Sequence, residues 1–329
     1  MLNTKQLVIG IDGGGTRTRV MVSDRQGHVL AYVEKGGASI HRDPLARDNV
    51  HEAIREALAA AGRTAAEVSG IAAGIAGYDK EEDLQWVESL TAVEGLDCPR
   101  WHFNDAVAAH YGALLTEPGI VVLSGTGSVI VAITEAGESI RNYDFHHYTG
   151  SGSRFISYNA VYEVLAGNTA PADSLLVQQL LEHWQVATVM ELAVLGKAGF
   201  MPGAKERDRR FEQFTPCITA AAVAGSPLAQ RVCDRCIQQM KIGIEMLALL
   251  FSSETVPVAF IGSVINSPYF KDNLTALLAC GNHKTYTLPA PVFSPVTGSV
   301  LYAISQLSDG IRPAPAVMDN LRRSIHTRP

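Results

Sequence analysis

Residues 12–16 read Asp-Gly-Gly-Gly-Thr, and no other segment limits so narrowly what this chain can fold into. They follow an apolar run at 7–11, which predicts a buried β-strand, and they precede a second β-forming run at 19–23. Three residues without side chains let backbone N–H groups approach anionic oxygens, and Asp12 at the strand end can hold Mg²⁺ through water. The segment therefore predicts a phosphate-binding hairpin, against the alternative of a tight hairpin whose glycines serve only the turn.

A second loop of this kind stands at residues 124–128, which read Ser-Gly-Thr-Gly-Ser. It too lies between two β-forming runs, at 119–123 and 129–135. On its own such a turn fits a plain hairpin better than a phosphate loop. Together with the first loop it predicts two hairpins that clamp the phosphates of a nucleotide. The Walker phosphate motif and the dinucleotide-binding glycine motif are both missing from the sequence.

The remaining pattern repeats one plan twice, a β-meander followed by helices. In the first half the expected strands lie at 7–11, 19–23, 28–34, 68–74 and 101–104, and the expected helices at 48–61, 80–92 and from Asp105 onward. In the second half the expected strands lie at 119–123, 129–135, 138–142 and 256–261, and the expected helices at 155–166, 172–184, 186–195, 211–224, 227–252, 269–280 and 298–307. The repeat predicts an α/β fold.

The length of 329 residues allows two domains. We expect an N-terminal domain at 1–116, a C-terminal domain with a helical insertion at 117–310, and a loose or peripheral tail at 311–329. The last expected helix is a candidate to pack on the N-terminal domain.

Composition excludes several classes of protein. A hydrophobic fraction of 47% is that of a folded globular chain, and 27 Lys and Arg against 33 Asp and Glu give a net charge of −6, which disfavours nucleic-acid binding. The apolar runs are too short to cross a membrane, and the chain begins without a secretory cleavage site, so we expect a cytoplasmic protein. The five cysteines do not form a disulfide pattern, and Cys233 and Cys236 are expected to be core thiols rather than a metal or redox site.

Asp105 is the candidate general base. It follows the short strand at 101–104, which places its carboxylate at the carboxyl edge of the sheet, where α/β proteins bind their ligands. Phosphoryl transfer needs a carboxylate there to deprotonate the attacking hydroxyl. The alternative is an ordinary helix-capping aspartate, which the two phosphate loops make less favourable.

Six segments together resemble the BadF/BadG/BcrA/BcrD-type ATPase family, which includes N-acetylglucosamine and glucosamine kinases. They are residues 12–18, 74–77, 103–106, 124–128, 261–269 and 295–298. The family belongs to the sugar kinase, Hsp70 and actin superfamily, so the resemblance implies two ribonuclease-H-like domains that close on ATP and Mg²⁺, a sugar as the second substrate, and a homodimer. It also implies Asp105 as the catalytic base and Asp12 at the metal.

The resemblance assigns the remaining site residues by position. The nucleotide would be bound by Gly13, Gly14, Gly15, Thr16, Arg17, Thr18, Ser124, Gly125, Thr126, Gly127, Ser128, Gly262 and Ser263. The acceptor would be contacted by Ser39, Gly77, Asn104, Thr126, Asp144, Gly150 and Ser151.

Two positions depart from the family pattern. Gly150 stands where the family carries a sugar-binding Asp, and Ile40 stands where it carries an Asn. The nucleotide loops are thus retained while the acceptor site is rewritten, which should change the acceptor. A replacement set is offered by Asp144, His146, His147 and Arg154, with the alternative that the two histidines lie on a surface loop.

The sequence therefore predicts an ATP-dependent kinase that phosphorylates a hydroxyl of an amino sugar or related sugar. One alternative is a BadF-type ATPase that activates a dehydratase through an iron–sulfur cluster shared between subunits, although the loop that comes after the second phosphate motif contains no cysteine to ligate such a cluster. Another is a nucleotide- or sugar-binding protein that has lost transfer.

Overall fold

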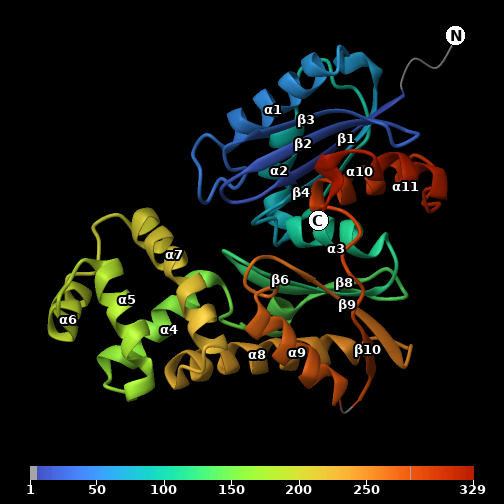
Figure 1. The fold of residues 1–329 in the computed structure, drawn as a ribbon. Coiled ribbons are helices and arrows are strands. Elements are labelled where there is room, and N and C mark those ends of the chain that lie inside the picture. The colour runs from blue at the N-terminus through green and yellow to red at the C-terminus, as the bar shows by residue number, and fades with distance from the viewer. Residues whose placement is uncertain (1–5, 282) are drawn as a thin grey trace, which may run out of the picture. The chain divides into compact units, whose positions relative to one another are not determined.

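The computed structural model describes residues 6–281 and 283–329, and it divides the chain into two compact units (Figure 1). Unit 1 holds the chain up to Val121 together with Glu135–Ser139 and Ala290–Pro329, and unit 2 holds Val122–Thr134 and Ile140–Pro289. The first unit is thus assembled from segments far apart in the sequence. The last forty residues belong to this unit, and they include the helix that the sequence made a candidate to pack on the N-terminal domain.

Unit 1 contains a five-stranded mixed sheet in the order β3-β2-β1-β4-β5. Its strands are β1 (Leu7–Gly13), β2 (Thr18–Asp24), β3 (Val29–Lys35), β4 (Val68–Ile75) and β5 (Arg100–Asn104). The first three pair antiparallel as the expected meander, and β4 and β5 join in parallel. Because β1 and β4 run parallel in the centre, Asp12 and Gly74 share one level of the sheet, next to the strand end at which Asn104 stands.

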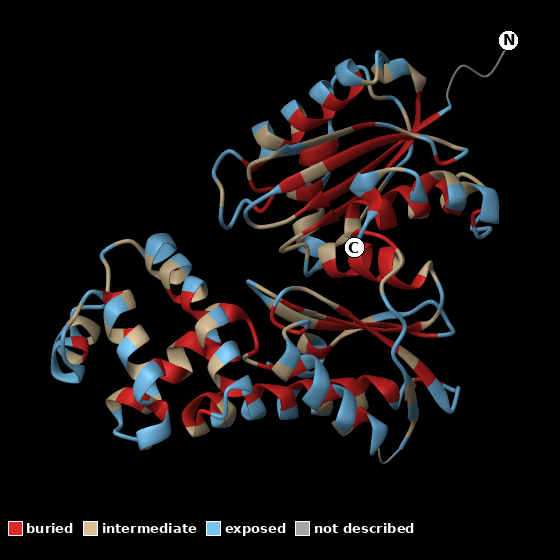
Figure 2. Ribbon diagram, in the orientation of Figure 1, coloured by how far each residue is buried: buried red, intermediate tan, exposed pale blue. Residues whose placement is uncertain are grey.

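Helices cover both faces of this sheet, and burial is densest between sheet and helix (Figure 2). The helices of unit 1 are α1 (Ala46–Ala60), α2 (Leu84–Thr91), α3 (Asp105–Leu114), α10 (Pro295–Gln306) and α11 (Pro315–Arg322), with short 3-10 turns at Ala65–Glu67, Glu81–Asp83 and Ile325–Thr327. Side chains alternate along β1, so Ile9 and Ile11 pack toward Ile54 of α1 while Val8 packs toward Val300 of α10.

The helix α10 packs against α3, β1 and β4, and small residues permit the contact. A Cβ atom built on Gly298 would lie 2.1 Å from the Ala108 carbonyl oxygen, and one built on Gly10 would lie 2.6 Å from that of Val296. The backbone of α10 therefore lies directly on α3 and on β1, the two elements that carry Asp105 and Asp12.

The tail at 311–329, expected to be loose or peripheral, contains a helix. Residues 315–322 form α11, which buries Met318 and Leu321 against the α10 side of the sheet. The helix is short and its apolar residues are few, so its periodicity does not stand out beside the neighbouring prolines and arginines.

Unit 2 contains a second five-stranded sheet in the order β10-β9-β6-β7-β8. Its strands are β6 (Gly119–Ser124), β7 (Ser128–Ile133), β8 (Ser139–Arg141), β9 (Thr255–Ile261) and β10 (Thr285–Thr287), with the starts of β6 and β8 assigned to unit 1. Taken in chain order, the strands of the two sheets occupy the same positions. The internal repeat read from the sequence is therefore a repeat of topology, and the predicted α/β fold is confirmed. The short strand β10 was missed.

The helices of unit 2 follow the expected ranges with shifted ends. They are α4 (Ser153–Leu165), α5 (Ser174–Trp184), α6 (Val189–Lys197), α7 (Ala204–Val223), α8 (Pro227–Ala248) and α9 (Pro268–Ala279), with 3-10 turns at Asn142–Phe145 and Pro171–Asp173. In α8 both Cys233 and Cys236 are buried core thiols, as expected, and burial raises the pKa of each. Among the described residues no helix is long and apolar enough to cross a membrane. Residues 1–5, which belong to the segment considered for a secretory signal, lie outside the described residues.

Candidate active site

The buried carboxylate Asp12 lies at the end of the central strand of unit 1. Its side chain is 6% exposed, and its Oδ2 accepts a hydrogen bond from Nη1 of Arg19 at 2.7 Å. The two residues face each other across the β1–β2 ladder. Burial raises the pKa of Asp12, and the Arg19 guanidinium partly offsets that rise.

The loop between β1 and β2 is a four-residue turn, closed by a hydrogen bond from the Gly14 N–H to the Arg17 carbonyl at 2.8 Å. A Cβ built on Gly13 would lie 2.7 Å from both Ala38 and Ile75, so the backbone there must be glycine for neighbouring segments to approach. Thr16 and Arg17 are exposed at the tip. Thr18 is buried, and its hydroxyl has no hydrogen-bond partner among the described residues.

Asp105 begins α3 at the edge of the same sheet, and Asn104 caps that helix by accepting a hydrogen bond from the Ala106 N–H at 3.0 Å. The Asn104 amide also donates to the Tyr78 carbonyl and to Oδ1 of Asp79, each at 3.1 Å. Asn104 thereby ties the start of α3 to the segment after β4. These bonds fix where α3, and with it Asp105, begins.

Asp105 is half-buried, and its environment raises the pKa of its carboxyl to about 7. The first cause is burial, and the second is the negative charge of Asp12, with a smaller effect from Asp79. A carboxyl that titrates near neutral pH can both accept and release a proton under ordinary conditions, which is what a general base requires.

The two acceptor-side positions that the sequence placed in unit 1 after β3 and β4 are neighbours. A Cβ on Gly77, which has φ +87°, would lie 3.3 Å from Oγ of Ser39 and 3.3 Å from a ring carbon of His41. Ile40 is 45% exposed, so the apolar side chain that replaces the family's Asn is not part of the core.

In unit 2 the loop after β6 is held by hydrogen bonds to the segment at 149–153. Ser124 is buried and donates through its Oγ to the Ser151 carbonyl at 2.7 Å, and the Ser153 N–H donates to the Gly125 carbonyl at 2.7 Å. Ser128 exchanges a hydrogen bond of 2.9 Å with Thr149. Thr126 and Gly127 at the tip are exposed, and a Cβ on Gly127 would meet nothing within 4 Å. The loop tip is therefore open while its ends are fixed.

The segment after β9 lies directly on this loop. Gly262 has φ +112°, and a Cβ there would lie 2.3 Å from the Ser124 carbonyl oxygen. That same carbonyl accepts hydrogen bonds from the N–H groups of Val264 and Ile265 at 3.0 and 3.2 Å. Ser263 lies beside Gly125, with its N 3.8 Å from a Cβ built there. The structure thus brings together the second loop and the predicted nucleotide contacts Gly262 and Ser263, all within unit 2.

The proposed replacement set for the acceptor does not form one cluster. Asp144 pairs with Arg141 at 3.2 Å, and Arg154 pairs with Asp208 of α7 at 2.7 Å. His147 lies 3.1 Å from the side-chain oxygen of Gln239. Each group has a different partner, so these side chains build the fold locally.

Gly150 and His146 both have a left-handed backbone, with φ +62° and +55°. At Gly150 a Cβ would meet nothing within 4 Å, so the position has space for a side chain but a backbone that disfavours one. A glycine meets this backbone without strain, whereas a side chain would be disfavoured by the backbone and not by lack of space.

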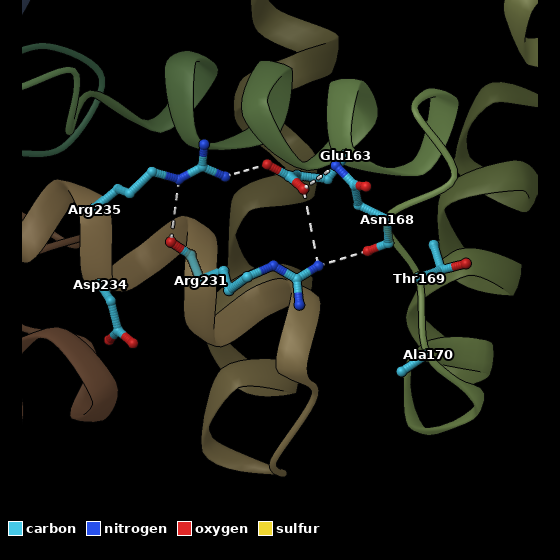
Figure 3. A pocket seen from close by; sticks show the side chains of 7 residues that line it. All are labelled: Glu163, Asn168, Thr169, Ala170, Arg231, Asp234 and Arg235. Atoms are coloured by element: carbon cyan, nitrogen blue, oxygen red, sulfur yellow. Dashed lines mark hydrogen bonds and ion pairs between the residues drawn. The ribbon is translucent and has the colours of Figure 1, made fainter.

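Unit 2 also has a cavity of 710 Å³ between α8 and the segment after α4 (Figure 3). Two arginines point into it, and both are already paired: Arg235 and Arg231 form ion pairs with Glu163, and Arg231 also donates to the Asn168 carbonyl. Asp234 adds a further carboxylate to the lining. The charges in this cavity are balanced, so it offers no free cation to an anion.

A divalent cation fits the residues at the first loop. Among the described residues no group of three or more His, Cys, Asp or Glu side chains forms a cation cage, and the buried carboxylate at the loop is that of Asp12. Mg²⁺ is commonly held by one or two carboxylates, retained waters and the phosphates of a bound nucleotide. The unpartnered Thr18 hydroxyl is a further oxygen in the same turn.

Sequence reasoning missed Arg19, although the hairpin could have revealed it. A turn at residues 14–17 sets position 12 opposite position 19, so the register alone pairs the carboxylate with a cation. Asp79 and Thr149 were also missed. They lie in irregular segments, and nothing in the sequence indicates which groups such segments contact.

Two sheets of one topology, each with a glycine loop between its first two strands, define the class: the two-domain fold shared by actin-like ATPases and sugar kinases. Residues 9–144 match the BadF/BadG/BcrA/BcrD ATPase family, which confirms the resemblance drawn from the motifs.

Relatives of known name bear on the same point. The chain is 25% identical over 267 residues to an N-acetylmuramic acid/N-acetylglucosamine kinase of Clostridium acetobutylicum, covering 79% of this chain and 86% of the relative. It is 29% identical over 206 residues to an N-acetyl-D-glucosamine kinase of Dictyostelium discoideum, covering 57% and 64%. A crystal structure from Chromobacterium violaceum, provisionally named an N-acetylglucosamine kinase, has a TM-score of 0.67 at 20% identity and covers 91% of this chain and 99% of that one. At 20% identity, the similarity to this crystal structure is evidence for the fold alone.

Proposed function

We propose that this protein is an ATP-dependent kinase that transfers the γ-phosphoryl group to a hydroxyl of an amino sugar or a related sugar. The observation that carries the proposal is that unit 1 holds two features together. One is a glycine loop with the buried carboxylate Asp12, and the other is the carboxyl of Asp105, whose pKa is raised to about 7. Relatives that are named sugar kinases support the same activity.

Asp105 would act on the acceptor. Its carboxylate would accept the proton of the attacking hydroxyl as the hydroxyl oxygen forms a bond to the γ-phosphorus and the bond to the β–γ bridging oxygen breaks, so that the electron pair leaves with ADP. Asn104 would hold the start of α3 in place through its bonds to Tyr78 and Asp79.

The loops would bind ATP. In unit 1 the turn offers its N–H groups other than that of Gly14, which donates to Arg17, together with the hydroxyls of Thr16 and Thr18. In unit 2 the open tip at Thr126 and Gly127 and the adjoining Gly262 and Ser263 would be further nucleotide contacts. Asp12 would hold Mg²⁺, which when bound neutralises phosphate oxygens.

Two observations support the choice of acceptor: the names of the relatives, and the residues Ile40 and Gly150, which depart from the family pattern. Relatives act on N-acetylglucosamine and N-acetylmuramic acid by their names, while Ile40 and Gly150 remove two polar groups that the family pattern supplies. We therefore propose a related sugar, contacted in unit 1 by Ser39, Gly77 and Asn104. We also propose a homodimer in the cytoplasm, where ATP is made and used.

The test is ADP release from Mg·ATP with a panel of N-acetylglucosamine, glucosamine, N-acetylmuramic acid, glucose and polyols. The expected result is turnover with one acceptor that is lost in Asp105→Asn. Binding of ATP without turnover on any acceptor would count against a kinase and favour a nucleotide-binding protein. Light scattering of the purified protein tests the homodimer.

A further inference from the structure

The segment at residues 36–43 is fixed over the first glycine loop. The Ala38 N–H donates to the Gly14 carbonyl at 2.9 Å, and a Cβ built on Gly37 would lie 2.6 Å from the Gly15 carbonyl oxygen. Asn49 of α1 clasps the segment from the other side by donating to the Gly37 carbonyl at 2.9 Å and to Asp43 at 3.1 Å. The segment is therefore held by bonds to both the loop and the helix.

Arg42 extends from this segment onto Gly15. A Cβ built on Gly15 would lie 2.7 Å from Cδ, 3.3 Å from Nε and 3.4 Å from Nη1 of Arg42. The side chain thus occupies the space that any larger residue at position 15 would need. The turn that carries it is closed by a 2.9 Å hydrogen bond from the Arg42 N–H to the Ser39 carbonyl.

Charge balance distinguishes Arg42 from the other arginines around the loop. Arg19 is paired with Asp12 at 2.7 Å, and Arg17 has Glu34 at 3.8 Å. In the described part of the chain Arg42 has no carboxylate partner. It is exposed, and its five N–H donors are available in a planar fork that matches phosphate oxygens.

We propose that Arg42 binds the terminal phosphoryl group of ATP and stabilises its charge during transfer. The role rests on the proposed function. As the acceptor oxygen bonds to the γ-phosphorus and ADP leaves with the bridging oxygen, the guanidinium donates to the non-bridging oxygens, and the acceptor proton passes to Asp105. Arg42 also accounts for Gly15, because only glycine leaves room for the arginine over the loop.

If Arg42 contacts the third phosphate, it should contribute to the binding of ATP but not to that of ADP. Arg42→Ala should weaken ATP binding at least 10-fold while ADP binding changes less than 2-fold, since ADP lacks the group that Arg42 holds. The loss in kcat should be about 10²-fold or more, the range found when a donor to a developing negative charge is removed. Arg42→Lys should recover part of it, because a lysine keeps the charge but not the fork.

Gly15→Ala provides an independent variant. The added methyl group meets the flexible side chain of Arg42, so it should displace the arginine without unfolding the loop. It should reproduce the loss of ATP-over-ADP preference, and the double variant should be no worse than Arg42→Ala alone. Arg47→Ala removes an exposed arginine from α1 nearby and serves as the matched control.

The experiment is calorimetric titration of ADP and of a non-hydrolysable ATP analogue, both with Mg²⁺, into each variant, with steady-state kinetics beside it. An unchanged ratio of the two affinities in Arg42→Ala overturns the proposal. So does a rise confined to the KM of the sugar, which would place Arg42 at the acceptor instead. If the unaltered protein neither binds ATP nor turns over, the proposed function itself fails, and that result is visible before any variant is made.

Discussion

Asp105→Asn separates the chemistry of the candidate base from its cost to stability. The carboxyl has a pKa of about 7 in the folded protein against 3.8 for an unperturbed aspartate. Three pKa units correspond to about 4 kcal/mol, and since the side chain is half-buried we expect about 2–4 kcal/mol. Because the folded pKa is raised, this stability is fully present below pH 4 and is lost as the pH rises toward 7. The neutral Asn side chain of the variant does not ionise, so the variant keeps this stability as the pH rises.

The variant should therefore unfold at higher urea concentration than the unaltered protein at pH 9, by about 2–4 kcal/mol, with the difference disappearing near pH 4. Its kcat should fall about 10²- to 10⁴-fold. The kcat/KM of the unaltered protein should rise with pH with an apparent pKa near 7. Asp48→Asn, at an exposed position on α1, should show no such gain at pH 9. Equal stability of Asp105→Asn and the unaltered protein at pH 9 would refute the reasoning from burial, and retention of most of the turnover would refute the role as base.

Three further variants test the packing around the loops. Arg19→Met removes the partner of the buried Asp12 and should lower the free energy of unfolding by about 1–3 kcal/mol at pH 8, less than for a fully buried pair because Arg19 is about one-third exposed. Urea unfolding should show a smaller loss at pH 5, because lowering the pH shifts the unpaired Asp12 toward its neutral form. An equal loss at pH 5 and pH 8 would contradict this account. Gly262→Ala places a methyl group 2.3 Å from the Ser124 carbonyl oxygen on a backbone with φ +112° and should cost about 2–4 kcal/mol; thermal unfolding measures it, and a variant as stable as the parent would show that the loop relaxes freely. Gly298→Ala forces α10 away from the Ala108 carbonyl and should cost about 1–3 kcal/mol and lower kcat through α3; the idea fails if hydrogen exchange of α3 is unaffected.

The parts of the fold that depend on local pattern were predictable. The strand at Leu7–Gly13 is a run of apolar residues that ends in glycines, and α8 carries apolar residues at helical spacing, so hydrophobic periodicity determines both. The glycine loops were predictable from local pattern as well, because several glycines at the end of a strand indicate either a tight turn or a site where the backbone binds an anion. The return of residues 290–329 to unit 1 was only partly predictable, since it depends on which face of the sheet lacks cover after β5.

The site was predictable where it depends on the end of a strand and not where it depends on an irregular segment. Asp12, Asp105 and the segments at 124–128 and 262–263 follow strands, and sheet geometry sets where strands end. The acceptor residues do not share this property. Asp144, His147 and Arg154 lie 16 to 26 residues after the second loop, and each has a different partner: Arg141 at the end of β8, Gln239 of α8 and Asp208 of α7. Arg42 depends on a loop whose course is decided by Asn49, seven residues farther along the chain.

The discontinuity of unit 1 has a consequence for biosynthesis. All of unit 2 lies between Val122 and Pro289, so its sheet and helices can be completed while the C-terminal forty residues are still unsynthesised. Unit 1 cannot be completed at that stage, because the face of its sheet that carries Val8 and Met21 is covered by Val300, Leu301 and Met318. During synthesis this face of the sheet therefore stays uncovered until residues 290–329 have been made, so unit 1, which starts first, can be completed only after the residues of unit 2.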